Sequence, residues 1–286
     1  MEIKNVLVIG AGTMGHGIAH VAAQAGCKAH LYDVDAAVVE KGLKQIEANL
    51  RKGVDKGKIT QEAFDATLAN VAAASIDLAE AAAVADLVVE AVPERMELKQ
   101  AIFKTLGESC PPHAILATNT SSLPVSDIAK ASGRPAQVIG MHFFNPVHIM
   151  KLLEVVRTDE TSDEVVEATR AIGERFGKTV IVVKDSPGFA TSRLGLVLGL
   201  EAIRMVEEGV ASPQDIDTAL ELGYRHPMGP LKLTDLVGLD VRLGIAEHLA
   251  NVLDDRRFEP PALLRKMVAD GKLGKKSGRG FYDWSE

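Results

Sequence analysis

The stretch VLVIGAGTMG, residues 6–15, sets the expected fold of this 286-residue chain. Residues 6–10 are a continuous apolar run rich in β-branched side chains, which is typical of a strand buried on both faces. Gly10, Gly12 and Gly15 form a GxGxxG pattern, and a helical pattern begins directly after it. A strand that passes through such glycines into a helix is the context in which this pattern binds a dinucleotide.

Each part of the glycine loop has a physical role. Gly10 permits the tight turn, Gly12 lets a pyrophosphate approach the backbone, and Gly15 lets the helix pack close to the strand. The start of the helix, at Thr13 and Met14, offers N–H groups and the positive end of the helix dipole to the phosphates. These five residues are therefore expected to bind the cofactor.

Asp33 decides which dinucleotide is expected. It ends the next predicted strand, about 21 residues past Gly12. A carboxylate there can accept hydrogen bonds from a ribose 2′-hydroxyl and would repel a 2′-phosphate, which favours NAD over NADP. The alternatives are a glycine-rich turn that binds nothing and an FAD site.

Outward from the loop, strand and helix patterns alternate, which predicts an α/β fold with a doubly wound, Rossmann-type, mostly parallel sheet. After DSPGF, residues 185–189, helical stripes replace the strand patterns. The sequence therefore predicts a dinucleotide-binding domain at 1–186 and an all-helical domain at 187–286. Strands are expected at 6–10, 28–35, 85–93, 114–119, 137–144 and 179–185. Helices are expected at 11–26, 36–52, 98–110, 126–132 (with Ser126 as N-cap), 190–208, 212–220, 233–254 and 260–271.

Composition narrows the function classes. The chain has 32 Lys and Arg against 39 Asp and Glu, a net charge of −7, so a nucleic-acid partner is not expected. No run approaches the ~18 apolar residues of a membrane span, and the N-terminus does not resemble a signal peptide. Cys27 and Cys110 lack metal-type spacing, so we expect no metal, no disulfide and a cytoplasmic location. The apolar, glycine-spotted stripe at 190–208 suggests a helix buried on several sides. Either the helical domain alone or a partner subunit could bury it, and we favour a dimer.

Polar residues follow two of the predicted strands. Asn119 and Ser121 come at the end of one strand, and His142 lies near the end of the next. In an open α/β sheet the ligand crevice lies beyond the carboxyl ends of the strands, so these side chains are expected to face it. Glu154 lies in a segment able to fold back against His142.

This set of residues can oxidise an alcohol. His142 can take the hydroxyl proton while a hydride leaves the adjacent carbon for nicotinamide. Glu154 would fix the imidazole tautomer and stabilise the imidazolium, and Ser121 could bond the substrate oxygen. The alternative is that His142 is a satisfied core histidine. His148 has no comparable placement and is expected to pack or to lie at the surface.

Several motifs, in order along essentially the whole chain, make it resemble the L-3-hydroxyacyl-CoA dehydrogenase family, and closely its short bacterial members that act on 3-hydroxybutyryl-CoA. The resemblance implies two domains, NAD as cofactor, interconversion of an L-3-hydroxyacyl-CoA and the 3-oxoacyl-CoA, and a homodimer through the helical domain. The motifs are VIGAGTMGHGIA, LYDVD, VVEAVPE, ATNTSSL, GMHFFNPVHIMKLLEVV, KDSPGF, HPMGPLKLTDLVGLD and KLGKKSGRGFYDW.

The resemblance also implies residue roles. It makes His142 the catalytic base, Glu154 its carboxylate partner and Ser121 a contact of both substrate and cofactor, with Asp33 on the adenosine ribose. For Glu94 and Lys99 the alternative is an ordinary surface ion pair. The further positions at which the family contacts the cofactor are Glu94, Lys99, Asn119, Asn145 and Lys276.

Two regions concern the acyl-CoA substrate. The family usually has an asparagine near the catalytic pair to bind substrate, and here Ser192 stands in its place; its hydroxyl can keep a hydrogen bond directly, through water, or not at all. The resemblance further implies CoA contacts at Asn49, Lys52 and Lys56, since cationic side chains suit its phosphates. The alternative is a solvated basic helix end.

Two other functions remain open from the sequence. One is an NAD-dependent dehydrogenase of a free 3-hydroxy acid, such as a sugar acid or carnitine, because such relatives share the fold and the glycine loop. The other is a non-catalytic NAD-binding protein.

Overall fold

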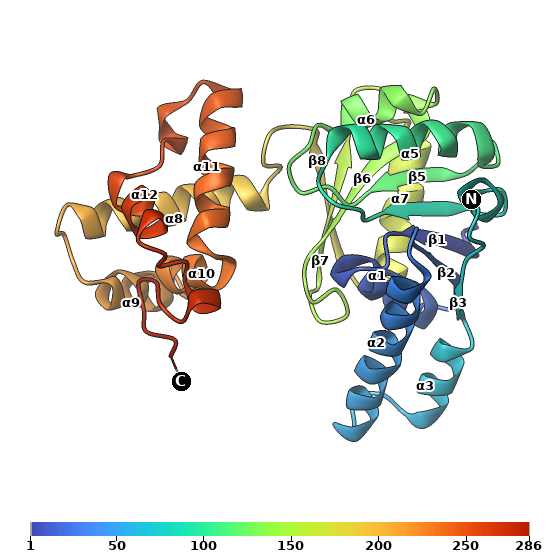
Figure 1. Ribbon diagram of the computed structural model, residues 1–286, viewed down its shortest axis with the longest axis horizontal. Coiled ribbons are helices and arrows are strands. Elements are labelled where there is room, and N and C mark those ends of the chain that lie inside the picture. Colours follow the sequence, from blue (N-terminus) through green and yellow to red (C-terminus); the bar gives the residue numbers. More distant parts are fainter. Residues whose placement is uncertain (1, 286) are drawn as a thin grey trace. The chain divides into compact units, whose positions relative to one another are not determined.

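The structure is a computed structural model that describes residues 2–285 (Figure 1). The chain divides into two compact units, Met1–Ser186 and Pro187–Glu286. Each unit encloses a hydrophobic core of its own, as a domain does. None of the described helices is long and apolar enough to cross a membrane.

The first unit is built on an eight-stranded sheet, in the order β3-β2-β1-β4-β5-β6-β7-β8. Neighbouring strands run parallel, except that β6 and β7 are antiparallel. The strand order reverses direction between β1 and β4, and such a switch point is where open α/β sheets bind ligands. The predicted fold class is therefore confirmed. The strands are β1 (Asn5–Ile9), β2 (Lys28–Tyr32), β3 (Val71–Ala73), β4 (Leu87–Glu90), β5 (Ile115–Thr118), β6 (Val138–Phe143), β7 (Leu152–Arg157) and β8 (Thr179–Lys184).

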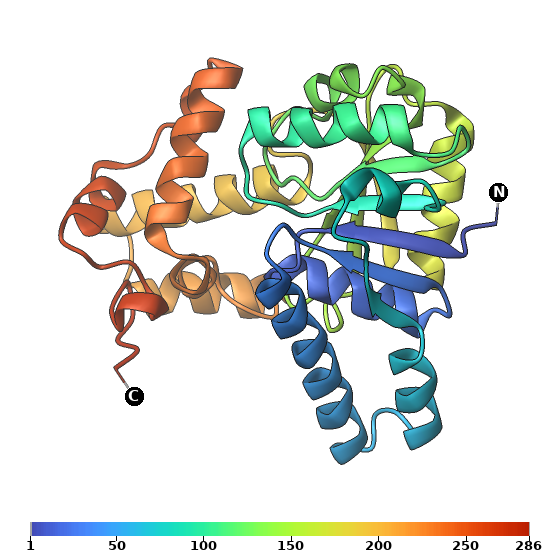
Figure 2. The same ribbon diagram turned by 45° about the vertical axis from the view of Figure 1, so that its right-hand side comes forward.

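Helices cover both faces of this sheet. On one face, Ile18 of α1 and Ile172 of α7 share a buried cluster with Val8 of β1. On the other face, α5 and α6 lie side by side (Figures 1 and 2), and a Cβ on Gly140 of β6 would lie 3.2 Å from the Val125 side chain of α6. The bounds are α1 (Thr13–Gln24), α4 (Leu78–Ala82), α5 (Met96–Ser109), α6 (Val125–Ala131), the 3₁₀ turn η1 (Pro135–Gln137) and α7 (Asp163–Arg175).

A helical hairpin, α2 (Ala36–Asp55) and α3 (Gln61–Leu68), extends beyond the sheet (Figures 1 and 2). Asp35 caps α2 by accepting a hydrogen bond from the Ala37 N–H at 2.9 Å. The two helices are joined by the Arg51 guanidinium, which lies 4.2 Å from the centre of the Phe64 ring.

Within residues 187–285 of the second unit, the regular elements are all helices. Leu196, Leu200 and Ile203 project from α8 into its core. Ser212 caps α9, and Pro213 takes its first position, where the missing N–H costs no hydrogen bond. The elements are α8 (Thr191–Glu207), α9 (Pro213–Gly223), α10 (Pro230–Val237), α11 (Leu239–Leu253), α12 (Ala262–Ala269) and the 3₁₀ turns η2 (Arg256–Phe258) and η3 (Lys275–Ser277).

Two buried carboxylates hold the C-terminal segment against these helices. Asp235 accepts hydrogen bonds from the N–H groups of Phe281 and Tyr282, both at 2.9 Å, and from the Trp284 indole at 2.8 Å. Asp217 accepts one from the Tyr282 hydroxyl at 2.7 Å. These bonds fix the backbone that follows the tight turn that carries Lys276.

Several elements differ from expectation. The strand β7 and the helices α3 and α7 are not predicted from the sequence. The predicted helix at 233–254 is instead two helices, α10 and α11, which meet at Gly238. The helix α6 begins at Val125, so Ser126 lies inside it and is not the N-cap; its N–H instead donates to Asp185 at 2.8 Å. A tertiary hydrogen bond therefore replaces the local cap.

Candidate functional site

The glycine loop is built as a phosphate cradle requires. Gly10 has φ +95°, which favours glycine, and a Cβ on Gly15 would lie 1.6 Å from the Gly10 carbonyl oxygen. A Cβ on Gly12 would meet no described atom within 4 Å. The loop is thus closed toward the protein at Gly10 and Gly15 and open at Gly12, where a ligand can approach the backbone.

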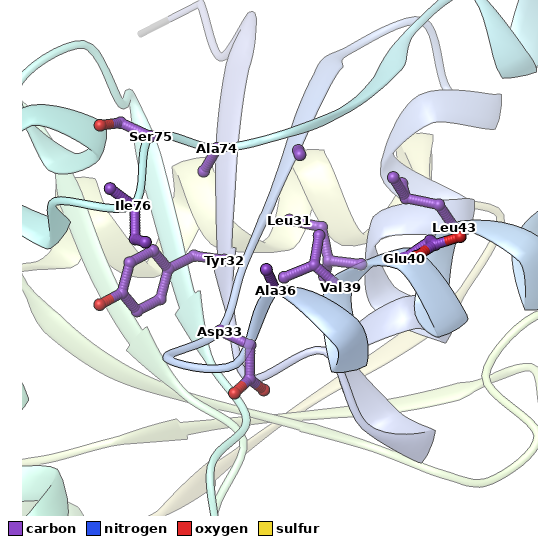
Figure 3. Close-up of a pocket in the computed structure, with 11 residues that line it drawn as sticks. Leu31, Tyr32, Asp33, Ala36, Val39, Glu40, Leu43, Ala74, Ser75 and Ile76 are labelled. Atoms are coloured by element: carbon purple, nitrogen blue, oxygen red, sulfur yellow. The ribbon is translucent and has the colours of Figure 1, made fainter.

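Asp33 is tied to the same loop. Its Oδ2 accepts a hydrogen bond from the Ala11 N–H at 2.8 Å. Loop and carboxylate together border a largely apolar cavity of about 610 Å³, which runs from Met14 past Val34 to Val92. A second, smaller cavity of about 200 Å³ lies between β2, α2 and residues 73–76; there the Asp33 carboxylate points away from the apolar side chains (Figure 3). The larger cavity has the size and the polar edge that an adenosine needs.

Glu94 organises the loop that carries Ser121. Its Oε1 accepts hydrogen bonds from the Thr120 hydroxyl at 2.5 Å and from the N–H groups of Ser121 and Ser122 at 2.9 and 3.1 Å. Burial disfavours the ionised carboxyl, but the Thr120 hydroxyl, the Lys99 ammonium and the Ser121 N–H outweigh it and hold the pKa of Glu94 below its ordinary value. Glu94 is therefore a fixed anion beside Ser121.

Lys99 is not part of a surface ion pair. Its side chain is 1% exposed, and its Nζ lies 2.7 Å from Glu90 and 3.3 Å from Glu94. Glu90, at the end of β4, is fully buried and also accepts from the Thr118 hydroxyl at 2.8 Å. Sequence reasoning missed Glu90, and its signal was a carboxylate ending the buried run LVVE.

The centre of the site is a buried imidazole–carboxylate pair. His142 of β6 lies directly opposite Glu154 of β7, and its Nδ1 is 2.7 Å from Glu154 Oε2. Both side chains point away from the face that Met141 occupies, because side chains alternate along a strand. His142 is 7% exposed and packs against Phe144, with the ring centroids 4.5 Å apart.

The predicted polar residues of the first unit fall into two groups. Asn119 links the ends of β5 and β6, because its Oδ1 accepts a hydrogen bond from the Phe143 N–H at 2.9 Å. Asn145 is exposed and lines a cavity of about 500 Å³ together with Gly12, Thr13 and Asn49. That cavity thus connects the glycine loop with α2.

The basic residues of α2 lie at its end. Lys52 is in the last turn and Lys56 is the C-cap, and both are exposed. Asn49, Lys52 and Lys56 are spaced three and four residues apart, so they share one side of the helix. His148 behaves as expected of a packing residue, since it stacks on His20 with the ring centroids 5.3 Å apart.

The remaining predicted residues belong to the helical unit. Ser192 lies in the first turn of α8 and is half-buried. Lys276 forms an ion pair with Asp240, at 2.5 Å between Nζ and Oδ1. Among residues 2–285 no three His, Cys, Asp or Glu side chains are grouped so that they would hold a metal ion.

Oxidation of an alcohol by a dinucleotide needs a nucleotide site and a proton acceptor at the same edge of a sheet. The parallel strands β1 and β4–β6 bring the glycine loop, Ser121 and His142 to one edge. The class that this arrangement defines is the NAD-dependent oxidoreductases that act on a CH–OH group.

Comparison with known proteins narrows the class to one family. Residues 5–186 match the family model for the NAD binding domain of 3-hydroxyacyl-CoA dehydrogenase, and residues 188–284 match the model for its C-terminal domain. The chain belongs to the 3-hydroxyacyl-CoA dehydrogenase family.

Individual relatives align with essentially the full length of this chain. A Bacillus subtilis protein named "Probable 3-hydroxybutyryl-CoA dehydrogenase" is 49% identical, with 100% of this chain and 99% of that one covered. The 3-hydroxyadipyl-CoA dehydrogenase of Escherichia coli is 44% identical over 99% of this chain and 60% of its own. The structure of (S)-3-hydroxybutyryl-CoA dehydrogenase from Ralstonia eutropha has a TM-score of 0.95 at 38% identity, with all of both chains covered.

Proposed function

We propose that this protein interconverts an L-3-hydroxyacyl-CoA and the 3-oxoacyl-CoA with NAD, with His142 as the general acid and base. The names of its relatives support 3-hydroxybutyryl-CoA as one substrate. The observation that carries the role of His142 is its buried 2.7 Å contact with Glu154 at the edge where the glycine loop lies.

His142 and Glu154 have different roles in proton transfer. If the Nδ1–H donates to Glu154, the tautomer is fixed and Nε2 is the basic nitrogen. His142 then takes the hydroxyl proton in oxidation and returns it in reduction, while the Glu154 carboxylate stabilises the imidazolium. Ser121, on the loop that Glu94 holds, hydrogen-bonds the substrate oxygen.

The residues at the edge of β1 and β2 fit NAD. The open backbone at Gly12 and the start of α1 suit its pyrophosphate, and Asp33 suits an unphosphorylated ribose. When bound, NAD accepts the hydride. Glu94, Asn119, Asn145 and Lys276 would complete its binding, whereas the enclosed Lys99 acts by holding Glu94 in place.

We expect residues of each unit to contribute to substrate binding. Asn49, Lys52 and Lys56 would bind the CoA moiety, and the 500 Å³ cavity that Asn49 lines offers a path toward the glycine loop. In the helical unit, the Ser192 hydroxyl would take over the hydrogen bond that an asparagine makes elsewhere in the family.

The assembly and location are part of the proposal. We expect a cytoplasmic homodimer formed through the helical unit. Exposed apolar side chains on α8, α10 and α11, among them Leu194 (66%), Leu236 (40%) and Val241 (42%), supply the apolar surface that such an interface covers.

The test is a substrate panel followed by NADH absorbance. L-3-hydroxybutyryl-CoA should be oxidised with NAD, and the free acid should be a far poorer substrate because it lacks the CoA contacts. Equal turnover of the free acid would favour a hydroxy-acid dehydrogenase. NAD binding without turnover of either compound would favour a non-catalytic protein.

A further inference from the structure

Arg242 of α11 is a buried cation that the proposed reaction does not use. Its side chain is 7% exposed, and burial lowers the pKa of its guanidinium. Its Nε has no hydrogen-bond partner among the described residues, and none of their ion pairs includes Arg242. A buried charge is costly unless a partner compensates for it, so a counterion is expected when the protein works.

The guanidinium lies against α8 at a glycine. A Cβ on Gly195 would lie 3.6 Å from Arg242 Nη1, so the bare helix backbone leaves room for the planar group. Ser192 precedes Gly195 by three residues and therefore lies on the same side of α8. Gly195, beside which the guanidinium lies, is thus about 4.5 Å along the helix axis from Ser192, the proposed substrate contact.

A second polar group faces the same row of glycines. A Cβ on Gly199, one turn beyond Gly195, would lie 3.1 Å from the Thr234 hydroxyl. Thr234 is fully buried, and its hydroxyl oxygen has no hydrogen-bond partner within residues 2–285. This side of α8 therefore faces two buried donors, a guanidinium and a hydroxyl, beside an otherwise apolar core.

We propose that Arg242 binds a carboxylate at the far end of the acyl chain, so that the preferred substrates are 3-hydroxyacyl-CoA thioesters whose chain ends in a carboxylate. The inference rests on the proposed function, because it takes Ser192 as a contact near the reacting carbon. The planar fork of arginine matches a carboxylate with two parallel hydrogen bonds. The 4.5 Å from Ser192 to Gly195 is close to the length of three carbon–carbon bonds, which separate C3 from the terminal carboxyl carbon in a six-carbon chain.

The experiment compares two chains of equal length. NADH oxidation is measured with 3-oxoadipyl-CoA, which ends in a carboxylate, and with 3-oxohexanoyl-CoA, which ends in a methyl group. The unaltered enzyme should prefer the carboxylate-ended thioester in kcat/KM. Arg242→Leu should lower kcat/KM for that thioester by about 30-fold or more and change the methyl-ended one by less than about threefold. Arg265→Leu, which removes the same charge from the exposed face of α12, should alter neither value.

Other outcomes would overturn the assignment. The assignment would be wrong if Arg242→Leu lowered kcat/KM equally for both thioesters. It would also be wrong if the unaltered enzyme preferred the methyl-ended thioester. Dissociation of an Arg242→Leu dimer in sedimentation would overturn it as well, because the counterion would then belong to a second subunit. If the unaltered enzyme turned over neither thioester, the proposed function itself would fail, which is a separate result.

A second measurement tests the proposal even if Arg242→Leu does not fold. Adipyl-CoA should raise the melting temperature of the unaltered protein more than hexanoyl-CoA does, and Arg242→Lys should reduce that difference because an ammonium lacks the planar fork. Equal protection by the two thioesters would contradict the proposal.

Discussion

His142 and Glu154 face each other across the β6–β7 pair, the antiparallel step in a sheet whose other described pairings are parallel. An antiparallel neighbour returns along the strand that it pairs with, so the first residues of β7 lie beside the last residues of β6. The base thus reaches the ligand edge of the sheet with its carboxylate already beside it. A parallel neighbour would have needed a long crossover before it could place a residue there.

Replacing the imidazole should separate chemistry from binding. His142→Gln should lower kcat by about 10²- to 10⁴-fold, because glutamine cannot take the hydroxyl proton. The dissociation constant for NAD, measured by calorimetry, should stay unchanged, since the glycine loop is untouched. His113→Gln is the control, because His113 pairs with Asp86 at the opposite edge of the sheet. A parallel loss of NAD affinity in His142→Gln would contradict the assigned role.

The choice of nucleotide should depend on Asp33. Asp33→Ala removes a charge-assisted hydrogen bond to the ribose, so the ratio of kcat/KM with NAD to that with NADP should fall about ten- to a hundredfold. Both cofactors should also bind more weakly, because the bond from the Ala11 N–H is lost. Asp35→Ala, two residues on, removes an equal charge from the cap of α2 and should leave the ratio as it is. An unchanged ratio in Asp33→Ala would exclude this role.

The buried lysine should be essential to the stability of the first unit. Lys99→Met leaves the fully buried Glu90 carboxylate without its ammonium, which should lower the free energy of unfolding by about 3 to 5 kcal/mol. Adding Glu90→Gln should recover most of the loss, because no buried charge then remains at that position. Lys130→Met breaks an exposed pair with Asp127 and should cost less than about 1 kcal/mol. Urea unfolding measures the free energy of unfolding of each variant. Similar losses in Lys99→Met and Lys130→Met would contradict the prediction.

An element could be predicted from the sequence only where its own residues carry the pattern that identifies it. β1 and β5 were predicted because both of their faces are buried and each reads as a continuous apolar run. β7 was missed because the run through LLEVV carries a glutamate, whose burial depends on His142 in the neighbouring strand. The antiparallel pairing is a tertiary property with no local signature.

The same limit applied to the buried charges. Lys99 lies on a helix, where a lysine is normally solvated, and only the tertiary approach of Glu90 accounts for its burial. Arg242 follows a valine in GLDVRLGI, and no spacing in that segment indicates that it faces the glycines of α8. The glycine loop, by contrast, contains its whole signal within six residues, and its place between a strand and a helix was predicted correctly.

Acid should destabilise the protein through a buried histidine. Burial, together with the neighbouring His148, His16 and Lys178, lowers the pKa of His20 from 6.5 to about 4. Well above pH 6.5 the imidazole is neutral whether or not the chain is folded, and stability does not depend on its titration. Between pH 6.5 and 4, His20 binds a proton in the unfolded chain but stays neutral in the folded protein. This difference lowers the free energy of unfolding by about 2 to 3 kcal/mol between pH 7 and 4.5.

A ring without a titratable nitrogen should remove this loss. His20→Phe keeps the stack on His148 and takes away the Nδ1, which is buried without a hydrogen-bond partner among the described residues. Urea unfolding at pH 7 and pH 4.5 should therefore show a smaller fall for His20→Phe than for the unaltered protein. The exposed His248→Phe should show the full fall. Equal falls in all three proteins would mean that His20 accepts its proton in the folded state as readily as in the unfolded chain.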